Sequence, residues 1–84
     1  MKRPNRQTIE TDISDTILEL RLPNTHARHQ ITGAAVLLWN TWKRKPDFEH
    51  GVQAVVKKYP VTETIARTDA ERLLTYFEES GLLE

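Results

Sequence analysis

The sequence predicts an α+β fold in which a three-stranded antiparallel sheet precedes three helices. Residues 8–31 contain three short runs in which apolar and polar residues alternate, the period of strands with one face in the core. After residue 31 the apolar residues recur at spacings of three and four, which places them on one stripe of each helix. Proline and glycine separate these helical runs. We therefore expect the element order β-β-β-α-α-α.

Length and composition narrow the class of protein. A chain of 84 residues forms a single domain with a small core. It contains no cysteine, which suits a reducing cytoplasm, and no apolar run near the ~20 residues of a membrane span. Its formal net charge is zero, whereas proteins that bind nucleic acid through phosphates usually carry a basic excess. We expect a cytoplasmic protein without nucleic-acid or membrane partners, with residues 1–7 as a disordered basic tail and residues 8–84 as one folded domain.

The three strands are predicted at residues 8–13, 16–22 and 25–31. In the second strand Leu18, Leu20 and Leu22 share one face, as a sheet with one solvated side requires. The third strand is polar, which suits the edge of a sheet better than its centre. An edge strand offers unpaired N–H and C=O groups to which an extended peptide can add. The candidate peptide-binding residues of this strand are His26, Ala27, Arg28, His29, Gln30 and Ile31.

The histidines of this strand do not predict a metal site. Residues three apart in a strand point to opposite faces, so His26 and His29 diverge. No cysteine and no other nearby histidine completes a ligand set. We expect neither a metal nor a cofactor.

Two helices follow the strands. The first is expected over residues 32–42 with Thr32 as its N-cap, and the second over residues 48–59 behind Asp47. We expect Trp39 in the core and Trp42 partly exposed. Gly51 lies inside the second helix and indicates close helix packing. The basic run at residues 43–45 is interpreted as a solvated loop, with a contact to an anion or a partner protein as the alternative.

The third helix carries the pattern that predicts function. It begins at Thr62 or after Thr68, where Thr68-x-x-Glu71 resembles a capping box, and Gly81 ends it in a left-handed cap before Leu82 and Leu83 fold back. Its buried stripe is Ala66, Ala70, Leu73, Leu74 and Phe77. Its flank is mixed and suits the wall of a peptide groove. The candidate wall residues are Asp69, Arg72, Leu73, Tyr76 and Phe77.

Three other functions were weighed against peptide binding. The last two helices resemble a helix-turn-helix, so a winged-helix DNA-binding protein is one alternative. Residues 62–84, however, hold six acidic and two basic residues. DNA phosphates would repel such an acidic recognition helix. An enzyme is disfavoured because no nucleophile–base spacing, glycine-rich phosphate loop or metal set is present. Asp69 and Arg72 are expected to form an exposed ion pair. A subunit adaptor that uses residues 42–45 is the third alternative.

Several motifs together resemble one family. Ile31-Thr-Gly-Ala-Ala-Val-Leu-Leu-Trp39 is similar to the helix opening L-N-x-T/G-A-x-x-I-W of PqqD-like proteins, and Tyr59 stands where that family ends its second helix. The stretch Ala66-x-x-Asp69-x-x-x-Leu73-Leu74-x-x-Phe77-x-x-x-Gly81-Leu82-Leu83 resembles the family's closing motif. The match needs no gap from residue 31 to residue 83. It departs from the family pattern at residues 43–44, 51 and 70, which concerns local loop and packing detail.

The resemblance implies a winged helix-turn-helix-like fold and a non-catalytic recognition function. PqqD-like domains bind the leader region of ribosomally synthesised, post-translationally modified precursor peptides, which adds as a strand to the third strand and lies against the third helix. Here these elements are residues 26–31 and the wall residues named above. The resemblance further implies two partners, a precursor leader peptide and a separate modifying enzyme such as a leader peptidase, as in lasso peptide biosynthesis. A PqqD-type chaperone of pyrroloquinoline quinone biosynthesis with a radical SAM partner is the alternative within the family.

Overall fold

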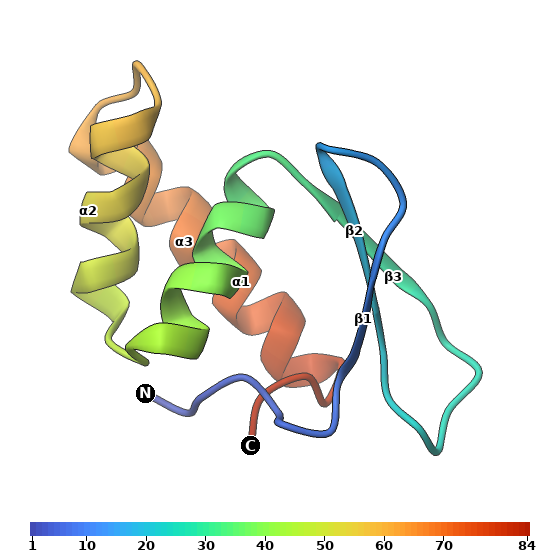
Figure 1. Ribbon diagram of the computed structural model, residues 1–84. Helices are drawn as coiled ribbons and strands as arrows, with labels where there is room; N and C mark the ends of the chain where they lie inside the picture. Colours follow the sequence, from blue (N-terminus) through green and yellow to red (C-terminus); the bar gives the residue numbers. More distant parts are fainter.

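The computed structural model describes all 84 residues, and its elements follow the predicted order (Figure 1). The strands are β1 (Ile9–Asp12), β2 (Ile17–Arg21) and β3 (His29–Thr32). The helices are α1 (Ala34–Arg44), α2 (Phe48–Lys58) and α3 (Glu63–Glu79). The predicted α+β class and the β-β-β-α-α-α order are therefore confirmed.

The sheet is an antiparallel meander in the order β1-β2-β3, so β3 is an edge strand as predicted. Leu18 and Leu20 of the central strand are buried on the core side. Glu19 was expected on a solvated face, yet it is only 8% exposed. Thr11 and Gln30 lie directly opposite it on either side, and these neighbours cover it.

β3 is shorter than predicted. Residues 25–28 lie outside the sheet, so His26, Ala27 and Arg28 are loop residues rather than strand residues. The register pairs Leu20 with His29, and β2 ends one residue later. Extending the ladder would set Pro23 opposite the loop, and proline has no N–H to donate. The chain instead turns at residues 23–24, where the N–H of Thr25 donates to the carbonyl of Leu22 at 3.3 Å.

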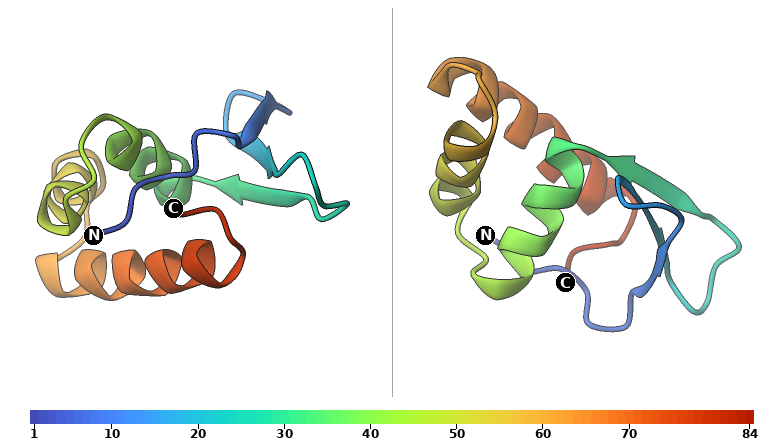
Figure 2. Two further views of the ribbon diagram at one scale, coloured as in Figure 1. Left: turned by 90° about the horizontal axis from the view of Figure 1, so that it is seen from below. Right: turned by 45° about the horizontal axis from the view of Figure 1, so that its top comes forward.

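The helices form two layers beside the sheet. Viewed from below, α3 lies under α1 and α2, and the strands extend beyond α1 (Figure 2). Gly51 of α2 faces Trp42 and Leu38 of α1 so closely that a Cβ atom at residue 51 would overlap the Trp42 indole. The close helix packing expected from Gly51 is confirmed.

The caps of the first two helices were predicted with unequal success. Asp47 caps α2 as predicted, because its side chain accepts a hydrogen bond from the His50 N–H at 3.3 Å. The predicted Thr32 cap is wrong. Thr32 is the last residue of β3, and the N-cap of α1 is Gly33, whose φ of +56° favours glycine. The chain therefore leaves the sheet and enters α1 within one residue.

α3 is a single helix. The Thr62 side chain accepts a hydrogen bond from the Ile65 N–H, so the start at Thr62 is confirmed and the alternative start after Thr68 is wrong. At the other end Gly81 has a φ of +74°, and the N–H of Leu82 donates to the carbonyl of Phe77 at 2.9 Å. This bond and that from Gly81 to Glu78 form a Schellman cap, as the predicted left-handed end requires.

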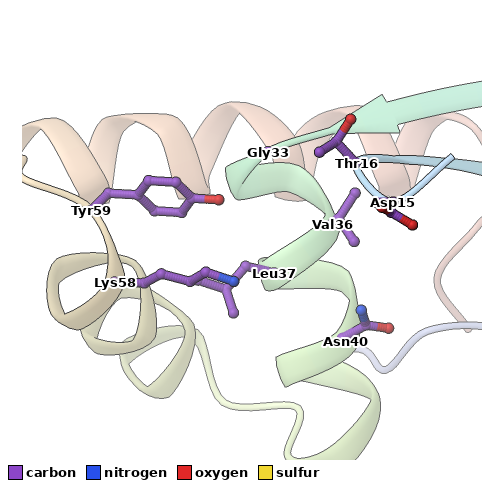
Figure 3. A pocket seen from close by; sticks show the side chains of 8 residues that line it. All are labelled: Asp15, Thr16, Gly33, Val36, Leu37, Asn40, Lys58 and Tyr59. Atoms are coloured by element: carbon purple, nitrogen blue, oxygen red, sulfur yellow. The ribbon is translucent and has the colours of Figure 1, made fainter.

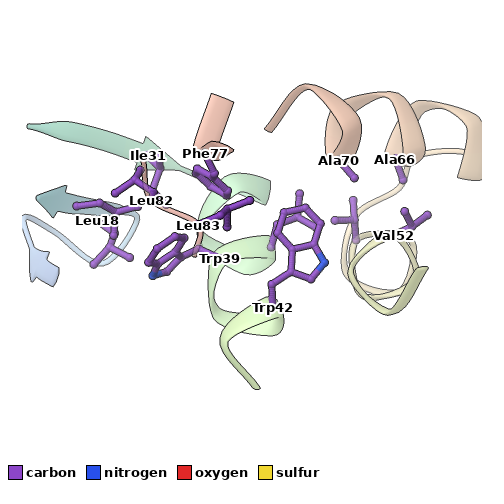
Figure 4. Packing of buried hydrophobic residues seen from close by; sticks show 13 residues of the cluster. Leu18, Ile31, Trp39, Trp42, Val52, Ala66, Ala70, Phe77, Leu82 and Leu83 are labelled. Carbon is purple, nitrogen blue, oxygen red and sulfur yellow. The ribbon is translucent and has the colours of Figure 1, made fainter. Parts of the chain in front are cut away.

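The core joins all three helices to β2 and β3 (Figure 4). Trp39 packs edge-on against Phe77, with 5.3 Å between ring centroids. Trp42 is fully buried rather than partly exposed, and its Nε1–H donates to the Asp47 carbonyl at 3.1 Å. Because this carbonyl accepts its hydrogen bond, the indole N–H is satisfied although the ring is buried. The buried apolar residues are Leu18, Leu20, Ile31, Leu38, Trp39, Trp42, Val52, Val55, Ala66, Ala70, Phe77, Leu82 and Leu83.

The N-terminal residues, expected as a free tail, lie against the C-terminus in the structure (Figure 1). We call residues 3–6 the N-terminal strap. Glu84 exchanges backbone hydrogen bonds with Arg3 at 2.8 and 3.3 Å, and the Asn5 N–H donates to Leu82 at 2.7 Å. Pro4 sits opposite Leu83 between these bonds, where no N–H is needed. The expectation of a disordered tail missed this pairing because its two halves lie at opposite ends of the sequence.

Candidate peptide-binding site

β3 presents an open edge to solvent. One side of the strand pairs with β2, and no element pairs with the other side. No backbone hydrogen bond of residues 26–32 occurs outside the sheet ladder. Since alternate residues of an antiparallel strand direct their N–H and C=O groups outward, this edge has donors and acceptors available for one more strand. The predicted edge is therefore present, over four strand residues rather than seven.

The side chains of β3 divide between the two faces of the sheet. Ile31 is buried opposite Leu18, so its side chain belongs to the core and only its backbone reaches the edge. His29 is half-buried on the same face, opposite Leu20. Gln30 is exposed on the other face. The available side chains are therefore His29 on the helix side and Gln30 on the outer side, with the exposed loop residues His26, Ala27 and Arg28 preceding them.

The flank of α3 meets β3 through Tyr76, and the other predicted wall residues lie along the same helix. Tyr76 is 40% exposed, Arg72 is exposed, and Asp69 and Leu73 are half-buried. The exposed ion pair expected between Asp69 and Arg72 is wrong, because neither residue forms a salt bridge. Both charges are therefore free to meet a ligand.

Phe77 does not reach this wall. Its side chain is fully buried between the two tryptophans, with ring centroids 5.3 Å from Trp39 and 6.3 Å from Trp42. It was predicted to serve both the core and the groove, and the structure gives it only the core. The neighbouring Tyr76 carries the aromatic surface of the wall instead.

One contact joins the two walls. His29 Nδ1 lies 2.6 Å from Tyr76 Oη, and the two rings meet edge-on with centroids 5.6 Å apart. The residues are 47 positions apart in the sequence, so no local pattern could pair them. This hydrogen bond places the start of β3 beside the C-terminal half of α3. We refer to the surface between β3 and α3 as the β3–α3 groove.

The apolar flank of α3 continues beyond the predicted wall to Ile65. This side chain is 50% exposed and lies four residues before Asp69 on the same helix face. Ile65 was not among the predicted wall residues, although its spacing of four from Asp69 and eleven from Tyr76 places it on the same flank. The flank thus has exposed apolar residues at both ends and two free charges between them.

The β3–α3 groove is a shallow surface and not a preformed cavity. The structure has two hollows, and both lie elsewhere. One of about 190 Å³ crosses α1 between the β1–β2 turn and the end of α2, with Val36, Leu37 and Tyr59 among its lining residues (Figure 3). The other, of about 270 Å³, lies between the N-terminal strap and the end of α1. An occupant of the β3–α3 groove must therefore be held mainly by edge pairing and side-chain contact.

The groove offers a free strand edge, an exposed phenol and two charges without an ion-pair partner. No group of three or more His, Cys, Asp or Glu side chains is arranged to hold a metal ion. The groups whose pKa is displaced by hydrogen bonding and charge, Glu49, Arg67 and Glu84, belong to surface ion pairs outside the groove. No helix is both long enough and apolar enough to cross a membrane.

Comparison with solved structures finds the same fold in two proteins. The structure of TbiB1 in complex with the TbiA(beta) leader peptide superimposes with a TM-score of 0.87 at 18% identity, covering 98% of this chain and 94% of the other. A lasso peptide synthetase B1 complexed with the leader peptide gives 0.84 at 20% identity, covering 98% and 95%. No protein-family model and no curated protein matches the sequence. At these identities the likeness establishes the fold.

Proposed function

We propose that this chain is a non-catalytic recognition protein that binds the leader region of a ribosomally synthesised precursor peptide. The observation that carries the proposal is the open edge of β3 facing the mixed flank of α3. Two proteins of the same fold were solved with leader peptides bound, which supports the same ligand class here. The leader adds to β3 as a fourth strand and lays alternate side chains against α3.

The backbone of the leader supplies register and part of the affinity. Each hydrogen bond to the β3 edge contributes about 0.5–1.5 kcal/mol net. The four residues of β3 limit the number of such bonds, and ordering a flexible peptide offsets part of their gain, on the order of 2–5 kcal/mol. Apolar side chains must therefore supply the remainder, at about 25 cal/mol per Å² buried. Tyr76 and Leu73 are the wall residues that offer this surface.

The free charges of the groove select among leaders. Asp69, Arg72 and Arg28 have no ion-pair partner within the chain. Each stands to pair with an opposite charge on the leader for at most about 1 kcal/mol in such an exposed setting. These pairs act on specificity more than on total affinity. The sum of the terms is consistent with a Kd near micromolar, or about −8 kcal/mol.

The bound leader is then presented to a separate modifying enzyme, a leader peptidase of the lasso peptide type, in the cytoplasm. The chain itself supplies no catalytic group in this scheme. Its role is to hold one end of the precursor so that the peptidase meets the cleavage site at a raised local concentration. The absence of a preformed cavity in the groove suits an extended peptide better than a small substrate.

The proposal is tested by fluorescence polarisation with labelled leader peptides from precursor genes adjacent to this one. We expect saturable binding by the wild-type protein and a loss of about tenfold or more in Tyr76→Ala, which removes apolar surface. Arg72→Ala removes one exposed charge pair and should weaken binding by at most about fivefold. Ile13→Ala is the matched control, because Ile13 is 48% exposed and lies in the connection between β1 and β2, outside β3 and α3. Equal losses in Ile13→Ala and Tyr76→Ala would refute the β3–α3 groove.

Random duplex DNA is the second control. The fold is winged-helix-like, so DNA binding is the rival outcome. Duplex binding that falls steeply with salt, with no leader bound, would show that the protein is a DNA-binding winged helix instead.

A further inference from the structure

The two basic runs of the sequence, 40 residues apart, meet on one side of the molecule. Residues 1–7 contain Lys2, Arg3 and Arg6, and the end of α1 continues into Lys43, Arg44 and Lys45. The fold brings them to the two sides of the 270 Å³ hollow, which is lined by residues 3–6, Thr8, Glu10 and Lys43. We call this surface the basic hollow. For residues 43–45 a contact to an anion or a partner protein was the alternative to a solvated loop, but neither run indicated that the two meet.

The charges of the basic hollow do not cancel. Glu84 pairs with Arg3 and Arg6, at 3.3 and 3.4 Å, and Glu10 pairs with Lys43 at 2.8 Å. Glu78 lies 3.8 Å from Lys2. Arg44 and Lys45 are exposed and have no ion-pair partner. Three cations, Arg3, Arg6 and Lys43, therefore line the hollow with the carboxylates of Glu10 and Glu84 as their partners. The unpaired cations Arg44 and Lys45 follow Lys43 in the chain, so the positive excess lies beside the hollow at the end of α1.

The lining of the hollow specifies the chemistry of an occupant. Apart from Pro4, its lining residues are polar or charged, and three of them are cationic. A carboxylate-bearing segment gains charge-assisted hydrogen bonds from guanidinium and ammonium donors. The volume of about 270 Å³ compares with about 30 Å³ for one water molecule, which leaves room for a few side chains.

We propose that the basic hollow is the docking site for an acidic segment of the modifying enzyme that receives the bound leader. This inference rests on the proposed function. The hollow is built from the strap, β1 and the end of α1, whereas the leader groove is built from β3 and α3. A leader in the groove therefore leaves the hollow free. One side of the domain holds the peptide while another holds the enzyme.

A second copy of this chain is a poorer occupant, even though residues 62–84 are acidic. Contact between the basic side of one copy and the acidic α3 side of the next is heterologous. Such contacts continue into rings or open filaments unless the geometry closes. An acidic segment of another protein meets the same charges without this consequence.

The test measures two bindings on the same variants. The peptidase encoded beside the precursor gene is titrated onto the immobilised, leader-loaded protein, and leader affinity is measured separately by fluorescence polarisation. Arg44→Glu with Lys45→Glu reverses two exposed cations whose side chains form no ion pair within the chain, so the fold should be kept. Lys57→Glu with Lys58→Glu at the end of α2 is the matched control, because both lysines are also exposed and unpaired.

We expect the Arg44/Lys45 pair to weaken enzyme binding by at least ~10-fold, the control pair by less than about twofold, and leader affinity to change in neither. Arg6→Ala, which removes a cation that lines the hollow, is expected to weaken enzyme binding as well. Wild-type binding of the enzyme should fall with added salt.

Four outcomes would overturn the inference: no enzyme binding to the leader-loaded wild-type protein, unchanged binding in the Arg44/Lys45 pair, equal losses in the two pairs, or self-association of the chain that the Arg44/Lys45 pair abolishes. Each leaves leader binding intact as a separate result. Conversely, failure to bind a leader, with enzyme binding that still depends on Arg44 and Lys45, would refute the proposed function and retain the docking site.

Discussion

The two long sides of α3 differ in what they contact. On the inner side Ala66, Ala70 and Phe77 have no exposed surface, and small residues let α2 and α1 approach the helix. On the outer side Ile65 and Tyr76 are 50% and 40% exposed. Exposed apolar surface contributes little to folding, whereas a groove for an apolar peptide side chain requires it. The difference separates the residues that hold the fold from those available to a ligand, and substitutions on each side should have separable effects.

The largest effect is expected on the inner side. Phe77→Ala removes a fully buried ring from between Trp39 and Trp42 and should lower the free energy of unfolding by about 3–5 kcal/mol. That is a large share of the 5–15 kcal/mol typical of a domain. Urea denaturation followed by tryptophan fluorescence measures it. Leader affinity of the fraction that remains folded should be nearly unchanged, and a stable variant that has lost leader binding would show that Phe77 belongs to the groove after all.

A second test of the packed side is Gly51→Ala. Alanine is the better helix former by about 1 kcal/mol, but its Cβ would overlap the Trp42 indole and lie 3.0 Å from Leu38 Cδ2. Trp42 cannot swing aside freely, because its Nε1–H is bonded to the Asp47 carbonyl. Overpacking of about 1–3 kcal/mol should therefore exceed the propensity gain. A melting temperature above that of the wild type would mean that α1 and α2 separate more easily than their packing indicates.

These two positions also show what the sequence can predict. The spacing of three and four identified the inner stripe of α3, and Gly51 inside a helix indicated close packing, because both signals are local. The sheet order and the edge position of β3 followed from alternation and turn residues in the same way. For the candidate site, the spacing placed Asp69, Arg72 and Tyr76 on one flank of α3, and their role in binding stays a prediction. Phe77 is fully buried, because it packs between the two tryptophans of α1.

What the sequence could not predict depends on partners far along the chain. The strap pairs with residues 82–84, and its polar sequence gives no sign of that. The length of β3 is set by where β2 ends. Residues 26–28 have the alternation of a strand, but no residue of β2 pairs with them. The contact between His29 and Tyr76 joins two elements 47 residues apart. Each of these features depends on contacts between residues that are distant in the sequence.

On the outer side, Tyr76→Phe tests the hydroxyl separately from the ring. The substitution deletes the hydrogen bond to His29 Nδ1 and keeps the apolar surface of the wall. Stability should fall by no more than about 0.5–1.5 kcal/mol. Leader affinity should stay within ~3-fold of the wild type, in contrast to Tyr76→Ala, because buried area rather than the hydroxyl holds the peptide. A loss in Tyr76→Phe as large as that in Tyr76→Ala would assign the binding to the hydroxyl.

The smallest effect concerns the strap, which lies on neither side of α3. The Arg6 backbone N–H donates to the Glu84 carboxylate at 2.9 Å, and together with the Arg6 and Arg3 charges it holds the pKa of Glu84 below its ordinary value of 4.5. A lowered pKa means that the folded state favours the ionised form. The stabilisation of the folded state by ionised Glu84 is therefore fully present above pH 4.5 and is lost as the pH falls through the lowered pKa. Because Glu84 is exposed, the change in stability should be small.

Amide NMR shifts of Arg6 and Glu84 between pH 6 and pH 2.5 should follow this titration, and Glu84→Gln should remove it. The pKa of Glu49 is also lowered, because its carboxylate accepts hydrogen bonds from Arg67. The titration of Glu49 should persist in the Glu84→Gln variant. Neither carboxylate belongs to the β3–α3 groove, so Glu84→Gln and the wild type should bind the leader with equal affinity at each pH. A fall in leader affinity that Glu84→Gln abolishes would couple the strap to the groove and end the separation of the two sides.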